Sequence, residues 1–496
     1  MRPFEEENDM KLKTLLEKVK YECLQGDVNV EITNLTHDSR KVQEGSVFTC
    51  IVGAVVDGHN FIKDVIAMGA KALIVQKEVV APENVTVIKV EDTRYALAYL
   101  SAAYFGYPAK QMKMIGITGT KGKTSTSYMI QDMLKAAGYK VGALGTIEAV
   151  IGDEKIPMNN TTPDSFTLHS YFKRMLDAGC NAVVMEVSSQ GLKYHRTAGV
   201  EFDYGLFTNL SPDHIGPNEH DSFEDYMQSK ALLFKQSKLG IANIDDEHFE
   251  EITKDALCPI ETFGLHENAD LRASDIELVR EKDYLGIDFK LSGVENYEVQ
   301  EGVPGKFSVY NALGAISVAR HFGIGEEIVN EVLRQFKVKG RIQIVPTGSD
   351  YTLIIDYAHN AVSLESILKT LREYRPARLI SMFGCGGNRS KLRRYEMGEV
   401  SGKFADFTVI TSDNPRFEEP QDIIDDIIIG MKKTDGEYKE IIDRKEAISY
   451  CINNAKTGDI VLLAGKGHED YQEIRGIKYH MLDEEIAKDV LSGVKY

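Results

Sequence analysis

The sequence predicts an α/β protein of three domains: a small α/β domain at the N-terminus, a central domain on a parallel sheet, and a Rossmann-like α/β domain at the C-terminus. The chain has 496 residues, which at about 150 residues per domain gives about three domains. Apolar segments of strand length alternate with amphipathic segments of helix length, which indicates βαβ units and parallel sheets. The pattern changes near residues 110 and 338, so we expect domains over 1–110, 111–338 and 339–496.

The first domain mixes short strands with helical segments. Apolar runs at 28–35, 46–51, 72–75 and 85–90 predict strands, and the spacing of apolar residues over 61–68 predicts a helix. This mixture favours a small α/β domain.

The central domain has the clearest strand-to-helix transitions. A strand is expected at 114–118, followed by a glycine-rich turn and a helix over 124–137. The segment 181–187 is almost continuously apolar, as expected for a parallel strand buried on both faces of its sheet. A polar, turn-rich region over 240–300 predicts a smaller β-rich part of the same domain.

The alternation of strands and helices restarts in the C-terminal domain. Strands are expected at 352–355, 378–383, 406–412 and 459–464, with helical patterns between them. This order predicts a second parallel sheet of the Rossmann type.

Composition and charge exclude several classes of protein. The 58 Lys and Arg residues against 76 Asp and Glu residues give a net charge of −18, which argues against a protein that coats nucleic acid. The six cysteines lie far apart without a CxxC pair, so neither a disulfide framework nor a structural zinc site is expected. The N-terminus lacks the apolar core of a signal peptide, and there is no run of about 18 apolar residues that would span a membrane. We therefore expect a cytoplasmic protein that binds neither nucleic acid nor membrane.

The strongest local signal is Gly116-Ile-Thr-Gly-Thr-Lys-Gly-Lys-Thr-Ser125, between an apolar strand and a helix. Glycines there let backbone N–H groups surround phosphate oxygens at the positive end of the helix dipole. Lys123 is expected to neutralise phosphates and the Thr124 hydroxyl to bind Mg²⁺. Five residues rather than four separate Gly116 from Gly122, and the alternative is a glycine-rich turn without a ligand. We predict a P-loop ATPase-like sheet whose nucleotide contacts are Gly119, Thr120, Lys121, Gly122, Lys123, Thr124 and Ser125.

Three other side chains are candidates for the same site. Glu186 lies near the end of the apolar strand over 182–187, and open α/β sheets bind ligands at the carboxyl ends of their strands. His214 follows another expected strand, and Lys230 lies in the helical stretch 223–234. Each also has an explanation without a functional role: Glu186 as a capping or surface residue, and His214 and Lys230 as structural residues.

In chain order, the motifs resemble those of the Mur ligase family over nearly the whole chain. The P-loop has that family's Gly-Thr-x-Gly-Lys-Thr form, which accounts for its spacing. The other matching segments are Thr36-His-Asp-Ser-Arg40, Asp57-Gly-His59, Asn160-Thr-Thr-Pro163, Glu186-Val-Ser-Ser189, Gln228-Ser-Lys-Ala231, Gly340-Arg341, Asp356-Tyr-Ala-His359, Gly384-Cys-Gly-Gly387 and Ala464-Gly-Lys-Gly-His-Glu469.

The resemblance implies an ATP-dependent amide-forming ligase of peptidoglycan precursor synthesis. ATP would phosphorylate the γ-carboxylate of D-Glu in UDP-MurNAc-L-Ala-D-Glu, giving an acyl phosphate and ADP, and an amine would then displace the phosphate. The partners implied are ATP, Mg²⁺, UDP-MurNAc-L-Ala-D-Glu and a diamino acid. A monomer is expected.

The resemblance also implies roles for particular residues. The catalytic residues would be Lys123, Glu186, His214 and Lys230. The Mg²⁺ ligands would be Thr124, Glu186, His214 and Lys230, with Lys230 carbamylated to N6-carboxylysine, because a carbamate supplies the oxygen ligands that Mg²⁺ prefers. Further nucleotide contacts would come from Asn311, Arg341 and Asp356. The UDP-MurNAc-dipeptide would contact Ser39, Asn160, Thr161, Thr162, Ser188, Tyr194 and Arg196.

The segment Asp413-Asn-Pro-Arg416 bears on the choice of amino acid. In the family it implies meso-diaminopimelate, whereas relatives that add lysine lack the Arg. Diaminopimelate differs from lysine by a second carboxylate, onto which a guanidinium can donate two hydrogen bonds. The alternative is an ordinary loop. The residues implied to bind diaminopimelate are Arg389, Asp413, Asn414, Pro415, Arg416, Gly465 and Glu469.

Several positions depart from the family pattern, namely Gln190, Tyr194, the segment 215–220 after His214, and Asn360-Ala361. We interpret them as adjustments around the muramoyl substrate, because the four catalytic candidates are retained.

Four alternatives remain open at this point. The ligase could add lysine or another diamine, or it could be similar to folylpolyglutamate synthase. A nucleotide-binding scaffold without catalysis is a third alternative, and a nucleic-acid-dependent ATPase is a fourth. The last is disfavoured by the charge of −18.

Overall fold

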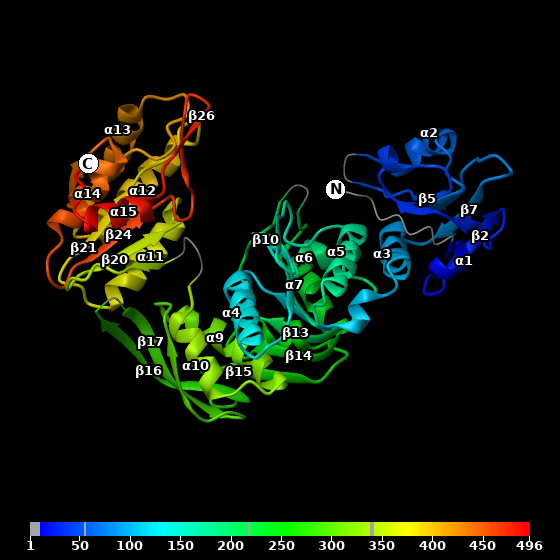
Figure 1. The fold of residues 1–496 in the computed structure, drawn as a ribbon, viewed down its shortest axis with the longest axis horizontal. Coiled ribbons are helices and arrows are strands. Elements are labelled where there is room, and N and C mark those ends of the chain that lie inside the picture. The colour runs from blue at the N-terminus through cyan, green and yellow to red at the C-terminus, as the bar shows by residue number, and fades with distance from the viewer. Residues whose placement is uncertain (1–9, 54–55, 217–218, 283, 338–341) are drawn as a thin grey trace. The chain divides into compact units, whose positions relative to one another are not determined.

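The computed structural model describes residues 10–53, 56–216, 219–282, 284–337 and 342–496. The chain forms two compact units, one made of Met1–Arg272 and Leu313–Gly325, the other of Ala273–Ala312 and Glu326–Tyr496. The α/β class with three sheet-based domains is confirmed (Figure 1). The proposed boundaries at 110 and 338 stay predictions, and residues 338–341 lie outside the described part of the chain.

The N-terminal sheet has five strands in the order β2-β7-β6-β5-β4. Its central pairs are parallel, and β2 joins the edge antiparallel. The strand expected over 28–35 is wrong, because Thr33 separates two short strands that join different sheets, with β3 paired to β1. The elements are β1 (Met10–Lys11), α1 (Leu12–Leu15), β2 (Tyr21–Gln25), β3 (Glu31–Ile32), β4 (Asn34–Thr36), η1 (Ser39–Lys41), β5 (Ser46–Thr49), η2 (Gly58–Phe61), α2 (Ile62–Ala67), β6 (Ala72–Val75), β7 (Thr86–Val90), α3 (Thr93–Tyr104) and η3 (Pro108–Gln111).

The central sheet of the first unit is parallel where it carries the glycine-rich loop. Strand β8 lies between β12 and β13, and β9, β14 and β15 extend the parallel pairing on either side. All five residues of β12 are buried, as the continuous apolar run predicted. The elements are β8 (Lys113–Thr118), α4 (Lys123–Ala136), β9 (Val141–Leu144), β10 (Glu148–Ile151), β11 (Glu154–Pro157), α5 (Ser165–Asp177), β12 (Ala182–Glu186), α6 (Ser189–Lys193), β13 (Phe202–Phe207), α7 (Phe223–Ala231), η4 (Leu232–Lys235), β14 (Ser237–Asn243), α8 (Phe249–Thr253) and β15 (Ile260–Gly264).

The strands expected over 240–300 are present, but Ala273–Ala312 belong to the second unit and not to the unit of the glycine-rich loop. The strands are β14 and β15, then β16 (Leu271–Glu281), β17 (Tyr284–Gly293) and β18 (Glu298–Glu301). Strand β18 pairs antiparallel with β17. Two helices and a 3₁₀ turn follow: α9 (Lys306–Ala319), η5 (Arg320–Phe322) and α10 (Glu326–Gln335).

The C-terminal sheet has six strands in the order β19-β20-β24-β21-β22-β23, parallel except for the edge strand β19. Its two faces bury separate apolar clusters: α11, α12 and α13 cover one face, and α14 and α15 the other. This is the predicted Rossmann-like layering. The elements are β19 (Gln343–Val345), β20 (Thr352–Asp356), α11 (Ala361–Glu373), β21 (Leu379–Phe383), α12 (Lys391–Phe404), β22 (Phe407–Ile410), α13 (Pro420–Met431), β23 (Glu437–Glu440), α14 (Arg444–Asn454), β24 (Ile460–Ala464), β25 (Tyr471–Ile474), β26 (Ile477–His480) and α15 (Asp483–Leu491).

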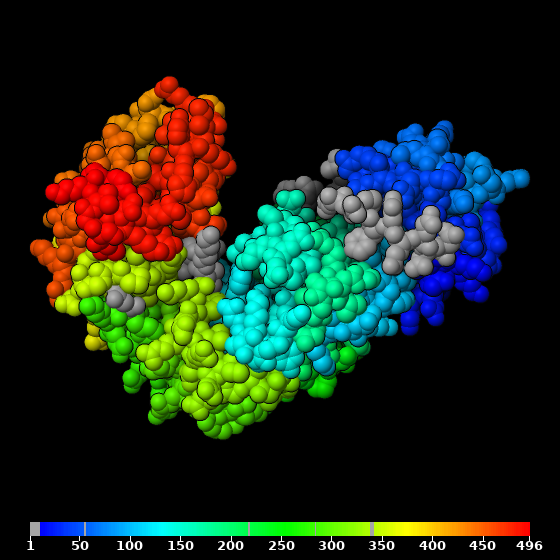
Figure 2. Space-filling view, viewed as in Figure 1, coloured from blue at the N-terminus to red at the C-terminus, as the bar shows by residue number. Residues whose placement is uncertain are grey.

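The hairpin β25–β26 is an exposed appendage of this second unit. Every residue of β26 is exposed, and the orange-red segment lies at the surface in Figure 2. The six cysteines are free thiols. Within the residues described, no helix is both long and apolar enough to cross a membrane.

Candidate active site

The glycine-rich loop joins the carboxyl end of β8 to the first turn of α4, as the sequence predicted. Gly119 and Gly122 have φ values of 148° and 86°, in the region that favours glycine. A Cβ on Gly119 would lie 2.0 Å from the Thr208 Oγ1 atom, so this position also lacks room for a side chain. The loop therefore has the backbone that a phosphate-binding turn requires.

The loop is held from outside by the segment that follows β13. The Asn209 carbonyl accepts a hydrogen bond from the Thr120 N–H at 2.8 Å, and its side-chain oxygen accepts one from the Lys121 N–H at 2.9 Å. The Thr208 hydroxyl donates to the Lys121 carbonyl at 2.7 Å. Sequence reasoning did not identify Thr208 or Asn209 as site residues, because these contacts join segments that are almost 90 positions apart.

Two lysine side chains reach into this loop, one from α4 and one from α7. Lys123 is partly buried and Lys230 is buried, and the Nζ atom of each donates to the carbonyl oxygen of Gly119 at 2.8 Å. The Lys230 Nζ atom also lies 4.4 Å from the centre of the Tyr226 ring. Burial lowers the pKa of both amines, and the neighbouring Lys123 lowers that of Lys230 further.

Glu186 lies at the carboxyl end of β12 and is only 2% exposed. Its carboxylate accepts hydrogen bonds from the Thr124 hydroxyl at 3.0 Å, the Thr146 N–H at 3.2 Å and the Thr146 hydroxyl at 3.0 Å. A Cβ on Gly145 would lie 2.5 Å from the carboxylate, so glycine leaves space for it. The structure thus brings the predicted Thr124 and Glu186 together and adds Thr146, which the sequence did not reveal.

His214 is exposed, unlike this buried cluster. Its side chain is 56% exposed, and Nδ1 lies 3.3 Å from a Glu219 carboxylate oxygen. Its φ of 53° is left-handed, and its ring centre lies 6.1 Å from that of Tyr226. In the part of the chain that the structure covers, no group of three or more His, Cys, Asp or Glu side chains is placed to hold a metal.

A buried relay connects helices α6 and α7. His220 is fully buried, with Nε2 2.8 Å from the Ser189 hydroxyl oxygen and Nδ1 2.9 Å from an Asp225 carboxylate oxygen. The same Asp225 oxygen accepts a hydrogen bond from the Lys193 Nζ atom at 2.6 Å. Burial lowers the pKa of His220, which keeps the imidazole neutral. This relay joins the helix after Glu186 to the helix that carries Lys230.

The residues expected at the UDP-MurNAc-dipeptide belong to the first unit. Thr162 is buried, and its hydroxyl donates to the Glu186 carbonyl at 3.1 Å and accepts from the Ser188 N–H at 3.0 Å. The Arg196 guanidinium donates to the Thr162 carbonyl at 2.8 Å, and burial lowers its pKa. Thr162 is therefore the centre of a network that contacts three predicted residues.

The other predicted dipeptide contacts surround this network or lie in the N-terminal sheet domain. The Thr161 hydroxyl lies 3.0 Å from that of Thr146, and Asn160 is exposed. The Arg94 guanidinium stacks on the Tyr194 ring at 5.0 Å. Ser39 is half-buried at the start of η1.

The second unit contains the residues predicted to bind the amino-acid substrate, on loops after β21, β22 and β24. The Asn414 Nδ2 atom donates to a Glu469 carboxylate oxygen at 3.0 Å, and the Gly387 N–H donates to the Asn414 carbonyl at 2.8 Å. The Arg416 guanidinium donates to the Gly387 carbonyl at 2.7 Å and pairs with Glu473 at 3.2 Å.

Four further members of this predicted set lie on the same loops. A Cβ on Gly465, whose φ is 108°, would lie 3.2 Å from an Asp413 carboxylate oxygen. Pro415 precedes Arg416, and Arg389 is exposed just before α12.

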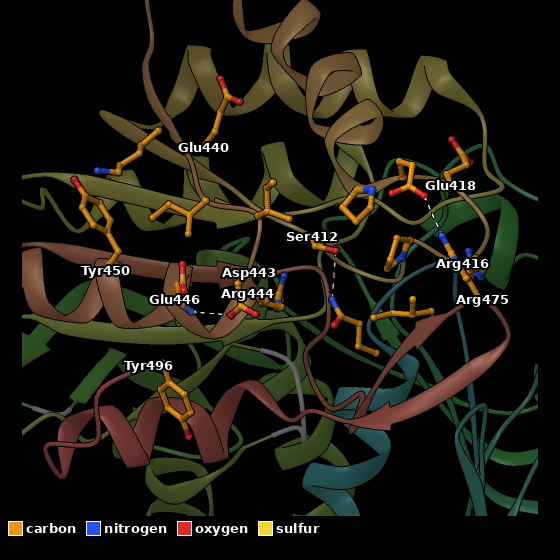
Figure 3. A pocket seen from close by; sticks show the side chains of 18 residues that line it. Ser412, Arg416, Glu418, Glu440, Asp443, Arg444, Glu446, Tyr450, Arg475 and Tyr496 are labelled. Carbon is orange, nitrogen blue, oxygen red and sulfur yellow. Dashed lines mark hydrogen bonds and ion pairs between the residues drawn. The ribbon is translucent and has the colours of Figure 1, made fainter.

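A cavity of about 1020 Å³ borders the same loop (Figure 3). Its lining includes Ser412, Pro415 and Arg416, but neither Asn414 nor Glu469. The cavity therefore adjoins the predicted amino-acid contacts through Arg416 and does not contain them all.

The remaining nucleotide candidates belong to the second unit. Asn311 is buried in α9, and Asp356 is buried at the end of β20. The Asp356 carboxylate accepts hydrogen bonds from the N–H groups of Ile342 at 2.9 Å and Ala358 at 2.8 Å. Arg341 lies outside the described residues.

Comparison with known proteins finds matches along most of the chain. Residues 31–105 match the Mur ligase family catalytic domain, 117–319 the Mur ligase middle domain, and 340–467 the Mur ligase glutamate ligase domain. The chain is 44% identical to UDP-N-acetylmuramoyl-L-alanyl-D-glutamate--2,6-diaminopimelate ligase 1 of Clostridium acetobutylicum, over 97% of this chain and 99% of that protein. It is 41% identical to the corresponding ligase of Clostridium perfringens, over 98% and 100% of the two chains.

Solved structures support the same grouping. A structure of a UDP-N-acetylmuramoyl-L-alanyl-D-glutamate--2,6-diaminopimelate ligase superposes with a TM-score of 0.80 at 27% identity and covers 98% of this chain and 99% of that one. The motifs, the fold and the full-length relatives thus agree. The chain belongs to the Mur ligase family, in its MurE branch.

Proposed function

We propose that this protein is the ATP-dependent ligase that joins meso-2,6-diaminopimelate to the D-Glu γ-carboxylate of UDP-MurNAc-L-Ala-D-Glu in peptidoglycan precursor synthesis. The observation that carries the amino-acid assignment is the joining of the Asp413–Arg416 loop to Glu469 through Asn414, at 3.0 Å. The same loop carries Arg416, whose guanidinium donates to the Gly387 carbonyl and pairs with Glu473. The names of the full-length relatives support the same reaction.

The reaction needs an activated carboxyl group, because a free carboxylate does not accept an amine. The D-Glu carboxylate oxygen attacks the γ-phosphorus of ATP, and the bond to the β,γ-bridging oxygen breaks, which gives an acyl phosphate and ADP. The amine of diaminopimelate then attacks the acyl carbon, loses a proton and expels inorganic phosphate. Most of the protein's contribution is positioning and charge neutralisation.

The glycine-rich loop and Lys123 would hold the nucleotide phosphates. The backbone contacts proposed are those of Gly119, Thr120, Lys121, Gly122, Thr124 and Ser125. Lys123 donates to the Gly119 and Thr120 carbonyls, at 2.8 and 3.1 Å, so its ammonium group already lies inside the loop. From the second unit, the proposed nucleotide contacts are Asn311, Arg341 and Asp356.

A magnesium ion fits the oxygen groups at the end of β12. The Thr124 hydroxyl and the Glu186 carboxylate are 3.0 Å apart, and both are hard oxygen donors of the kind that Mg²⁺ prefers. When bound, Mg²⁺ supplies positive charge to the phosphate oxygens. We propose Thr124 and Glu186 as ligands of one ion, and His214 and carbamylated Lys230 as ligands of a second.

The Lys230 environment supports carbamylation. Lys230 is buried, and burial together with Lys123 lowers the pKa of its amine. A neutral amine can attack CO₂ and lose a proton, which gives an anionic carbamate whose oxygens can bind a cation. His214 and Lys230 are therefore proposed as a pair in which the lysine carbamate supplies the oxygen ligands and the imidazole a nitrogen ligand.

The UDP-MurNAc-dipeptide would bind along the network around Thr162. The proposed contacts are Ser39, Asn160, Thr161, Thr162, Ser188, Tyr194 and Arg196. Thr162 contacts both the Glu186 carbonyl and the Ser188 N–H, so this network lies directly beside the proposed Mg²⁺ ligand. The substrate carboxylate would thereby approach the nucleotide phosphates.

Diaminopimelate would bind to the loops of the second unit. The proposed contacts are Arg389, Asp413, Asn414, Pro415, Arg416, Gly465 and Glu469. The guanidinium groups would receive carboxylates through paired hydrogen bonds, and Glu469 would receive the amine. A cytoplasmic location and a monomeric state are further parts of this proposal.

The test is phosphate release with ATP, Mg²⁺ and UDP-MurNAc-L-Ala-D-Glu, comparing meso-diaminopimelate with L-lysine. We expect release only with diaminopimelate, and Lys123→Ala should lower kcat by at least about 100-fold. Lys135→Ala, an exposed change on α4, should leave the rate unchanged. Equal or faster release with L-lysine would refute the amino-acid assignment, and no release with either amine would refute the ligase.

A further inference from the structure

Lys466 is an unusual lysine, because its side chain is fully buried in the second unit. It lies in the loop after β24, between Gly465 and Glu469 of the proposed amino-acid site. Its Nζ atom lies 3.1 Å from a Glu469 carboxylate oxygen and 3.3 Å from the Asn414 side-chain oxygen. Nothing in the proposed reaction yet uses this cation.

These three side chains form a closed triangle. The third side is the 3.0 Å hydrogen bond from the Asn414 Nδ2 atom to the same Glu469 oxygen that Lys466 contacts. The Asn414 side-chain oxygen also accepts the Glu473 N–H at 2.9 Å. Because two donors converge on this oxygen, the amide is oriented with its NH₂ group toward Glu469.

We propose that Lys466 is a positioning and specificity residue that joins the Asn414 loop to the Glu469 loop. The lysine holds an amide donor and a carboxylate acceptor side by side. Together these two groups would bind an end of the amino acid at which one carbon carries both an amino group and a carboxylate. This inference rests on the proposed function. Diaminopimelate has such an end at both termini, whereas L-lysine has it at only one.

The charges around the triangle support this role over simple filling of space. An apolar side chain would fill the same volume without the cost of burying an ammonium group. Lys466 is compensated by Glu469, whose side chain is only 21% exposed. The Asn414 side chain contacts both members of this charge pair, so the pair fixes the geometry of a neutral side chain. A positioning role explains why a cation occupies this place.

Lys466 also lowers the pKa of Glu469, the acidic group of the triangle. Burial acts to raise the pKa of Glu469, but Lys466, Asn414 and Tyr357 together hold it below its usual value. The charged and titratable groups that act on Glu469 come from several elements: Lys466 on its own loop, Tyr357 after β20, and Arg444 of α14, which is paired with Asp483. Removal of Lys466 therefore leaves Glu469 without its nearest cation.

The test compares Lys466→Met with Lys488→Met, the same change at an exposed lysine of α15 in the same unit. We expect Lys466→Met to raise the KM for diaminopimelate by about tenfold or more, while the KM for ATP stays within about twofold. The ratio of kcat/KM for diaminopimelate over L-lysine should fall by a similar factor. The acidic limb of kcat/KM for diaminopimelate should move to higher pH, which a loss of packing alone does not produce. Lys488→Met should change none of these values.

The wild-type protein separates failure of this inference from failure of the proposed function. If it shows no diaminopimelate-dependent phosphate release, the proposed function is wrong. If it is active, and folded Lys466→Met keeps the wild-type KM, selectivity and pH profile, the inference is wrong. Should Lys466→Met not fold, Lys466→Gln decides in the same assays, because it keeps a hydrogen-bond donor while it removes the charge. A cycle with Asn414→Ala should show non-additive changes in KM, and additivity would contradict the proposal.

Discussion

The side-chain amino groups of Lys123 and Lys230 both lie 2.8 Å from one acceptor, the main-chain carbonyl oxygen of Gly119. Two ammonium groups so close to one another repel, and burial disfavours the charged form of each. Lys230 is the more enclosed of the two and also faces the Tyr226 ring at 4.4 Å. This arrangement supports the proposal that Lys123 binds phosphate and that Lys230 reacts with CO₂ as a neutral amine.

The first prediction concerns this neutral amine. Protein prepared without CO₂ and bicarbonate should lose most of its ligase activity, because Lys230 would lack the carbamate, and added bicarbonate should restore it. Incubation of the free protein with ¹³C-bicarbonate should give a carbamate resonance by NMR. Lys230→Ala should abolish both the resonance and the activity, whereas Lys235→Ala, at the end of η4, should retain both. An active wild-type enzyme without a carbamate signal would contradict the modification.

The second prediction concerns the Glu186 carboxylate. Glu186→Gln keeps the size of the side chain but removes the charge that would bind Mg²⁺. The Mg²⁺ concentration for half-maximal phosphate release should therefore rise by about tenfold or more. Glu154→Gln, an exposed change on β11, is the matched control. An unchanged Mg²⁺ requirement in Glu186→Gln would remove this residue from the proposed metal site.

The third prediction concerns the relay through His220. His220→Ala leaves Ser189 and Asp225 without their shared partner and opens a cavity between α6 and α7. Buried hydrogen bonds and packing of this kind contribute about 2 kcal/mol or more, which corresponds to a drop of about 4–8 °C in thermal midpoint.

The kcat of His220→Ala should fall as well, because one of the two helices follows Glu186 and the other carries Lys230. His266→Ala, at an exposed position in the same unit, should leave both values unchanged. A wild-type midpoint in His220→Ala would show that the relay contributes nothing to stability.

The parts of the site that could be predicted from sequence are those encoded locally. Two local patterns can each be recognised within about ten residues: the glycines between β8 and α4, and the apolar run that ends at Glu186. The missed partners are distant in sequence: Asn209 contacts Lys121 across 88 positions, Thr146 contacts Glu186 across 40, and Ser189 contacts His220 across 31. Only the fold brings these pairs together.

The N-terminal strand prediction failed for a similar reason. Apolar residues over 28–35 alternate as in one strand, but Ile32 pairs with Met10, whereas Leu35 pairs with Val47 in the other sheet. Local patterning does not show which partner a strand residue will have. The order of the motifs was informative because it combines many weak local signals. The contacts of Lys466 could not be predicted, because Asn414 and Glu469 become its partners only in the folded unit.

The last prediction concerns Glu301, a fully buried carboxyl group at the end of β18. Burial raises the pKa of Glu301 to about 8, although the Ser308 side chain opposes the shift. Because the folded-state pKa exceeds that of the unfolded chain, the folded state binds more protons between about pH 4.5 and pH 8. Stability therefore falls as the pH rises through this window.

Replacing Glu301 with Met removes this titrating group from the core. Relative to the wild type, Glu301→Met should become more stable by up to about 1.4 kcal/mol for each pH unit from about pH 4.5 to pH 8, with no further gain above that range. Thermal midpoints of both proteins measured from pH 5 to pH 9 test this, with Glu298→Met, an exposed change on the same strand, as control. A difference that does not grow with pH would mean that Glu301 is ionised in the folded protein, and that buried groups around it stabilise its charge.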